Sequence, residues 1–176
     1  MNRTNGNNRG KFPLTYSEAL NEVYMIVGMS RGEKFDFKYR RNGNLIHLCP
    51  PAPMPEDYGY IPQTSTKDNE TLDVVLFCEE TTTQGMVVES RVVGGIEFQD
   101  ERVIDLKLLA VAIDDPEYGT FRSYRDLPKS RVEAVKEFFR SGADQETIRP
   151  VHPYEASWIT MESITRYHRS NSDPPA

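Results

Sequence analysis

Apolar and polar residues alternate along several short segments in the first two thirds of the chain. Between positions 34 and 40, Phe35, Phe37 and Tyr39 fall on one face and charged residues fall on the other. A period of two is typical of a half-buried β-strand. Longer apolar stretches predict further strands at residues 23–29, 72–78, 86–96 and 102–113.

The segments around these strands carry turn and loop signals. Asn42-Gly43 predicts a hairpin turn into a returning strand at 45–48, because both residues tolerate positive φ. The prolines between positions 50 and 55 exclude a central strand or a helix, so we expect a stiff loop that delivers residues 57–60. Gly94-Gly95 predicts a bulge or a sharp bend within its strand.

The pattern changes after Pro128, where apolar residues recur at helical spacing. One face of this first helix contains Val132, Val135, Phe138 and Phe139. A second helix is expected at 154–168, with Trp158 and Met161 in its core-facing side. Strands followed by helices predict an α+β domain in which the helices lie on a small barrel.

Composition limits the class of protein. The chain has 176 residues, enough for one domain at 14–169 with a core of its own, between a polar leader at 1–13 and a flexible tail at 170–176. Its net charge of −6 argues against a general nucleic-acid binder, which needs a basic surface. No apolar run reaches membrane-span length. Cys49 and Cys78 are best interpreted as reduced thiols of a cytoplasmic protein, and a disulfide stays open if the fold brings them together.

Carboxylates gather in two short blocks beside strand-like sequence. The blocks contain Asp68, Glu70 and Asp73, then Asp100, Glu101 and Asp105. Hard divalent cations prefer oxygen ligands, and Mg²⁺ held by carboxylates is the usual partner of phosphate chemistry. Each block alone would be interpreted as a solvated acidic turn. Together with the aromatic segment ahead of them, they predict a metal site.

Three motifs follow one another along the chain. Asp57-Tyr58-Gly59-Tyr60-Ile61 comes first, then Asp68-x-Glu70-x-x-Asp73-Val74, and then Asp100-Glu101 with Asp105-x-Lys107. Their order and spacing resemble those of the soluble inorganic pyrophosphatases of the β-barrel type (family I), in which Tyr-Gly-Tyr-Ile precedes Asp-x-Asp-Pro-x-Asp-Val. The resemblance extends over residues 23–169. It implies an OB-like, five-stranded β-barrel with two packed helices.

The resemblance also assigns roles to individual residues. It implies that Asp68, Asp73 and Asp105 are the principal ligands of Mg²⁺, with Mn²⁺ as a substitute, and that Asp100 binds a further metal ion. Glu70 lies where the family has the aspartate that helps activate the attacking water, so Glu70 and Asp68 are the expected catalytic residues.

Four further residues match the site of this family. Lys34, Tyr58 and Lys107 match residues that contact the substrate, and Asp36 matches a glutamate of the site. We expect Asp36 and Glu101 to support the metal ligands from behind.

Much of the phosphate-binding half of the family's site is replaced in this chain. Ile26-Val27-Gly28 stands where the family has a glutamate, and Gly142-Ala143 stands in place of a Tyr-Lys pair. The arginine that follows the hairpin in the family falls near Ile46 or His47, and a tyrosine is replaced around Met54. Candidate substitutes are Arg31, Arg40, Arg41, Arg91, Arg140, Arg149 and His152.

Three functions compete at this point. The first is Mg²⁺-dependent hydrolysis of inorganic pyrophosphate to phosphate by a metal-activated water. The second keeps the metals and acts on an organic phosphate or diphosphate, because the missing clamps would widen the site. The third is a non-catalytic binding protein. Glu70 is one methylene longer than the family's aspartate, so its carboxylate moves by about a bond length, whereas catalysis needs positioning within ~1 Å. The resemblance further implies a homo-oligomer and a small phosphorylated substrate. The charge and the lack of a long apolar run argue against nucleic acid and membrane as partners.

Overall fold

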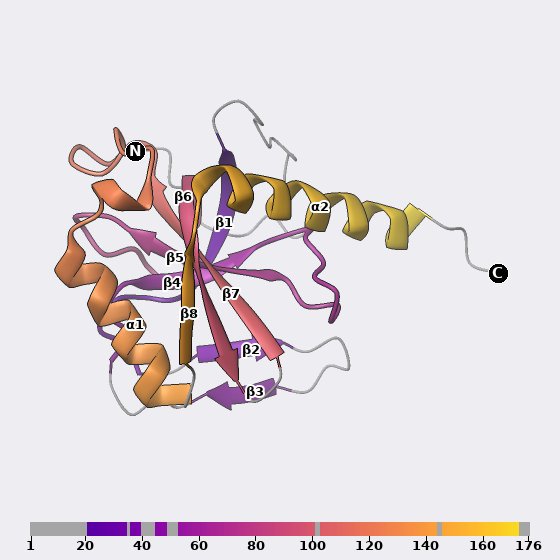
Figure 1. Ribbon diagram of the computed structural model, residues 1–176, viewed down its shortest axis with the longest axis horizontal. Helices are drawn as coiled ribbons and strands as arrows, with labels where there is room; N and C mark the ends of the chain where they lie inside the picture. Colours follow the sequence, from indigo (N-terminus) through magenta and orange to yellow (C-terminus); the bar gives the residue numbers. More distant parts are fainter. Residues whose placement is uncertain are drawn as a thin grey trace.

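A closed ring of five β-strands forms the centre of the molecule, with two helices laid on it (Figure 1). The computed structural model describes residues 21–34, 36–39, 45–48, 53–100, 103–143 and 146–172. In their pairing order, the ring strands are β1 (Glu22–Met29), β4 (Asp57–Ile61), β5 (Leu72–Phe77), β7 (Val103–Ala112) and β6 (Val87–Asp100). β1 also pairs with β6, which closes the ring. The expected α+β fold with a five-stranded barrel is confirmed.

Strand β6 turns the corner of the barrel. Its first residues pair with β1, and its last residues pair with an additional strand, β8 (Glu146–Val151). The register shifts between Val92 and Gly94, and Gly94 has φ +146°. A Cβ at Gly94 would lie 2.8 Å from the carbonyl oxygen of Val151, so a side chain does not fit there. The bend predicted from Gly94-Gly95 is therefore confirmed.

A separate hairpin is formed by β2 (Asp36–Tyr39) and β3 (Leu45–Leu48). The two strands are antiparallel, with Asp36 opposite Leu48 and Tyr39 opposite Leu45, so the predicted strand and its returning partner are confirmed. The predicted turn residues, the leader and Cys49 lie outside the described residues.

Two strands were not predicted. β4 contains the Tyr-Gly-Tyr segment, for which no strand was predicted, and it pairs with both β1 and β5. β8 lies between the helices and pairs with β6. It contains Pro150, which is tolerated because β8 is an edge strand of its sheet.

Helix α1 (Lys129–Ala143) begins directly after Pro128, as predicted, and a short 3₁₀-helix η1 (Tyr124–Asp126) precedes it. Helix α2 (Pro153–Ser172) packs on β6. The prediction that Trp158 lies in the core is wrong, because its side chain is 53% exposed. The buried face of α2 is made instead by small side chains such as Ala156, Thr160 and Ser163.

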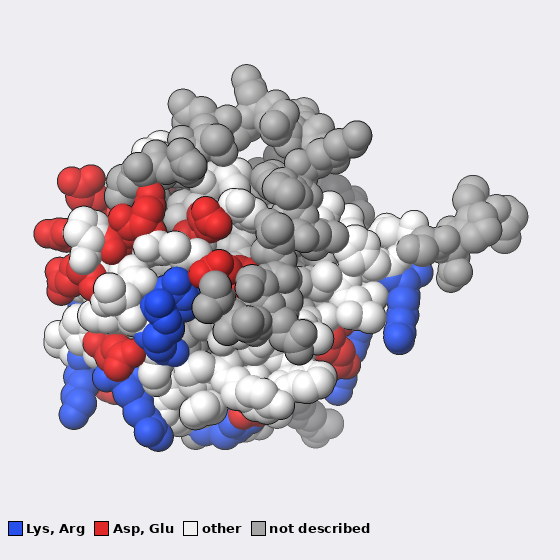
Figure 2. Space-filling view, turned by 90° about the horizontal axis from the view of Figure 1, so that it is seen from above, with Lys and Arg blue, Asp and Glu red and all other residues white. Residues whose placement is uncertain are grey.

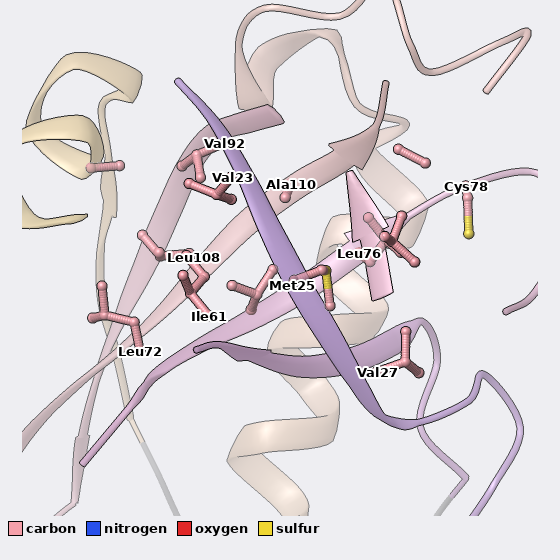
Figure 3. Close-up of a cluster of buried hydrophobic side chains, with 14 of the residues drawn as sticks. Val23, Met25, Val27, Ile61, Leu72, Leu76, Cys78, Val92, Leu108 and Ala110 are labelled. Atoms are coloured by element: carbon pink, nitrogen blue, oxygen red, sulfur yellow. The ribbon is translucent and has the colours of Figure 1, made fainter. Parts of the chain in front are cut away.

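Alternate residues of the ring strands belong to two different cores. Inside the ring, Val23 and Met25 of β1 pack with Leu108 and Ala110 of β7 (Figure 3). Outside the ring, a second cluster lies beneath α1 and contains Val75, Phe77, Leu109, Val111, Val135 and Phe139. Odd-numbered residues of β5 and β7 therefore face outward, toward α1.

The described surface is mixed in charge. On the face drawn in Figure 2, acidic side chains gather toward the left, and basic side chains lie chiefly along the lower edge. Within the described part of the chain, no helix is both long enough and apolar enough to cross a bilayer.

Candidate active site

The parallel pairing of β5 with β7 brings three charged residues together on the outward face. Asp73 pairs directly with Lys107, and Asp105 lies two residues earlier on the same face of β7. The Nζ of Lys107 donates to Asp73 Oδ2 at 2.5 Å, and it lies 2.8 Å from Asp105 Oδ2. It also lies 3.2 Å from the hydroxyl oxygen of Tyr58 on β4. Residues from both acidic motifs and from the aromatic motif thus meet at one ammonium group.

Aromatic rings enclose this group on the side of α1. The Lys107 Nζ lies 5.3 Å from the ring centre of Phe139 and 5.7 Å from that of Tyr58. The Lys107 side chain is 5% exposed, whereas Asp105 is 29% exposed. Solvent therefore reaches the group from the side of Asp105.

The ammonium of Lys107 stays charged despite this burial. Burial alone would lower the pKa of Lys107, but the adjacent carboxylates of Asp73 and Asp105 outweigh it and raise that pKa above the ordinary lysine value. The place between the two carboxylates is therefore strongly complementary to positive charge.

The loop before β5 carries Asp68 and Glu70, and both residues are exposed. Thr66 closes the loop: its amide donates to the Glu70 carbonyl oxygen at 2.8 Å, and its hydroxyl accepts from the Glu70 amide at 3.1 Å. Asn69 takes φ +61° at the tip, and its amide donates to the Thr66 carbonyl oxygen. Thr64 fixes the base of the loop, since its hydroxyl accepts from the amide of Leu72 at 3.0 Å.

The remaining predicted site residues are placed only in part. Lys34 is exposed in the segment between β1 and β2. Asp36 begins β2 and Asp100 ends β6, but their side chains are not described, and Glu101 lies outside the described residues. Among the side chains that the structure describes, no three carboxylates, histidines or cysteines converge closely enough to hold a metal ion.

The donor set nevertheless fits a hard cation. Asp73 and Asp105 direct carboxylate oxygens at one point, where a positively charged group already lies. The exposed acids of the Asp68–Glu70 turn precede the same strand as Asp73. Such oxygen donors are those that Mg²⁺ and Mn²⁺ prefer.

Most of the described basic residues that could replace missing phosphate clamps have protein partners. Arg31 donates to the carbonyl oxygens of Cys78 and Glu79. Arg91 donates to Gly119 O and pairs with Glu22, Arg140 pairs with Glu133 and Glu137, and Arg149 pairs with Glu97 and Glu155. The His152 ring accepts a hydrogen bond from the amide of Tyr154. Arg40 and Arg41 lie outside the described residues.

No chemistry was predicted for Glu56 and Asp57, yet both are almost fully buried at the start of the aromatic motif. Asp57 accepts hydrogen bonds from the hydroxyl of Thr81, from the amide and hydroxyl of Thr82, and from the amide of Arg31. These bonds anchor the start of β4, and with it Tyr58. Two consecutive acids at the start of an aromatic segment were the sequence signal that could have identified Glu56 and Asp57.

Comparisons with known proteins show the family to which the chain belongs. The family model described as inorganic pyrophosphatase matches residues 25–170. An inorganic pyrophosphatase of Haloferax volcanii is 29% identical over 143 residues, which is 78% of this chain and 80% of the relative. That of Geobacillus stearothermophilus is 26% identical over 162 residues, which is 88% of this chain and 98% of the relative.

The fold agrees with solved structures as well. The structure of inorganic pyrophosphatase from Helicobacter pylori superposes with a TM-score of 0.79 at 22% identity, over 90% of this chain and 99% of that one. At this identity the likeness shows the five-stranded barrel fold alone.

Proposed function

Because this chain belongs to the inorganic pyrophosphatase family, we propose that it hydrolyses inorganic pyrophosphate to two phosphates with the help of divalent metal ions. One observation carries the proposal: Asp73, Asp105, Lys107 and Tyr58, from three separate strands, converge on one partly solvent-accessible point. Carboxylates and a lysine at one point are the groups that metal-assisted phosphoryl transfer needs.

We assign the metal ligands to the acidic side chains. Asp73 and Asp105 would hold one ion, Asp68 would contribute from the loop, and Asp100 would hold a further ion at the end of β6. Bound ions of this kind neutralise phosphoryl oxygens and lower the pKa of a coordinated water. We propose Mg²⁺ as the natural ion and Mn²⁺ as its substitute.

The remaining site residues would act on the water and on the substrate. Glu70, supported by Asp68, would accept a proton from the attacking water. Lys34, Tyr58 and Lys107 would bind phosphoryl oxygens, and Asp36 and Glu101 would support the site. The homo-oligomeric state that the resemblance implies stays a prediction, and so does the cytoplasmic location that the two cysteines suggest.

A second candidate substrate is an organic phosphate or diphosphate. Its support is the end of α1, where Gly142-Ala143 offers neither a phenol nor an ammonium group to a phosphate. The ion pairs of Arg91, Arg140 and Arg149 with glutamates favour the same interpretation. A panel of phosphorylated metabolites, assayed beside pyrophosphate, separates the two candidates by their relative kcat/KM.

Phosphate release by the purified chain in Mg²⁺ tests the main proposal. The variant Asp73→Asn should reduce kcat by at least about 100-fold, because it replaces a charged metal ligand by a neutral amide. The matched control is Glu80→Gln, an exposed acid beyond the opposite end of β5, which should keep wild-type activity. Release of phosphate by the wild type no faster than by Mg²⁺ alone would reject pyrophosphate as the substrate.

A further inference from the structure

The ammonium of Lys107 lies between the two acids that we assign to a metal ion. Carboxylate oxygens of Asp73 and Asp105 are within 2.8 Å of Nζ, and the rings of Tyr58 and Phe139 lie on its other side. The Lys107 side chain is almost fully buried, and solvent reaches this group from the side of Asp105. Lys107 therefore supplies the positive charge that two neighbouring carboxylates require inside a protein.

A divalent ion that binds Asp73 and Asp105 competes with this ammonium for the Oδ2 atoms of both residues. Mg²⁺ binds its oxygen ligands at about 2.1 Å, which would put it in contact with an ammonium that already lies on those oxygens. Two cations so close in a desolvated place repel each other strongly. Lysine can leave, because its charge lies at the end of a flexible four-carbon chain. The open side of the group, at Asp105, provides a route by which the ion can enter.

We propose that Lys107 is an exchangeable internal cation, which holds Asp73 and Asp105 in place in the metal-free protein and is displaced by a divalent ion. The inference rests on the proposed function, and it makes Lys107 a positioning residue for the metal ligands as well as a ligand of the substrate. Once displaced, the ammonium is available to the phosphoryl oxygens. Metal binding thus prepares the site for the anion, so the ion binds first and the substrate second.

Calorimetric titration with Mg²⁺ in the absence of substrate tests the exchange. In Lys107→Met the internal competitor is gone, so the affinity for Mg²⁺ should rise by about tenfold. The control Lys67→Met removes an exposed lysine next to Asp68 and should change the affinity by no more than about twofold, which is the effect of a solvated charge.

Unfolding measurements provide a second readout if Lys107→Met is hard to purify without metal. Its midpoint temperature should fall in chelator and recover in Mg²⁺ by more than that of the wild type, whereas Na⁺ at equal ionic strength should not restore it. In the wild type, the ¹⁵Nζ resonance of Lys107, assigned by its loss in the variant, should shift on addition of Mg²⁺.

The outcomes separate this inference from the proposed function. If the wild type binds Mg²⁺ and splits pyrophosphate while Lys107→Met binds Mg²⁺ no more tightly, the exchange is wrong and the function stands. An unchanged ¹⁵Nζ resonance at saturating Mg²⁺ also overturns the exchange. A wild type that takes up no divalent ion overturns both.

Discussion

Glu56, directly before β4, and Arg131, in the first turn of α1, form a two-pronged ion pair. The Nε of Arg131 donates to Glu56 Oε1 at 2.5 Å, and Nη2 binds Oε2. Nη1 of the same guanidinium donates to the hydroxyl of Tyr118, and Nη2 also donates to the carbonyl oxygen of Cys78. This guanidinium joins α1 to the barrel, and α1 carries Phe139 onto Lys107. The pair is therefore one of the contacts, together with Val135 and Phe139, that hold the helix against the barrel beside the candidate site.

Arg131→Met should destabilise the protein by about 3 kcal/mol, because it leaves the carboxylate of Glu56, which is 2% exposed, without its main counter-charge. Urea unfolding followed by circular dichroism measures the change. The control Arg140→Met breaks ion pairs that are largely exposed on the same helix and should cost less than about 0.5 kcal/mol. Equal costs for the two variants would contradict the assigned role.

The loss of stability in Arg131→Met should also depend on pH. Burial raises the pKa of Glu56 above that of an exposed glutamate even though Arg131 opposes the shift, and removal of Arg131 raises it further. A carboxyl whose pKa is raised by folding binds more protons in the folded state, so its contribution to stability is lost as pH rises through the folded pKa. The difference in free energy of unfolding between Arg131→Met and the wild type should therefore decrease as the pH falls from about 8 to about 5.

Much of the fold could be predicted because its strands have clear patterns. The alternation at 34–40, the apolar stretches and the helical spacing after Pro128 correspond to observed elements. β4 and β8 lack such patterns. β4 follows a proline-rich segment, and β8 is a short edge strand with polar residues and Pro150. Both are held mainly by pairing with neighbours far away in sequence, which local propensity cannot register.

The candidate site was predictable only where the motifs were specific. Asp73, Asp105, Lys107 and Tyr58 were expected in one site, and the structure brings them together. That Lys107 would lie between the two carboxylates could not be read from the sequence, because it depends on the register of β5 against β7. The packing of Phe139 on Lys107 likewise depends on how α1 crosses the barrel.

Gly59 should be intolerant of any side chain. A Cβ at this position would lie 1.9 Å from the carbonyl oxygen of Ile26, where β4 pairs with β1. Gly59→Ala should therefore force the strands apart and cost about 3 kcal/mol or more in chemical unfolding. Gly32→Ala is the comparison: Gly32 has φ +88° with open space around it, so only backbone strain of about 1 kcal/mol is expected. A milder effect at Gly59 than at Gly32 would refute the close approach of the strands.

A change in side-chain size should destabilise the protein on the buried face of α2 but not on its exposed face. Trp158→Gln removes a large ring that is mostly in solvent and should change the free energy of unfolding by less than about 0.5 kcal/mol. Ala156→Leu adds volume at a fully buried position against the barrel and should cost about 1–3 kcal/mol. Thermal unfolding measures the stability of the two variants. A larger loss of stability for Trp158→Gln than for Ala156→Leu would mean that the face of the helix with Trp158 is the buried one.

Thr66 should be a positioning residue for the acidic turn that carries Asp68 and Glu70. Its hydroxyl accepts a hydrogen bond from the Glu70 amide at 3.1 Å, four residues along the loop. Thr66→Val keeps the shape of the side chain and removes this bond, so the turn loses a constraint on the two carboxylates. A displacement of ~1 Å at a reacting group can cost as much as 100-fold in rate, and we expect kcat on pyrophosphate to fall by about 10-fold or more.

Two comparisons distinguish positioning from loss of stability. Thr66→Ser keeps the hydroxyl and should restore kcat to within about twofold of the wild type, because the hydrogen bond is retained. Thr165→Val removes an exposed hydroxyl that donates to the Met161 carbonyl oxygen on α2, and should leave kcat unchanged. Since we assign the affected carboxylates to the metal and the water, the loss of activity in Thr66→Val should appear in kcat and in the Mg²⁺ concentration for half-maximal rate. A rise in KM alone, with kcat unchanged, would mean that Thr66 serves substrate binding instead.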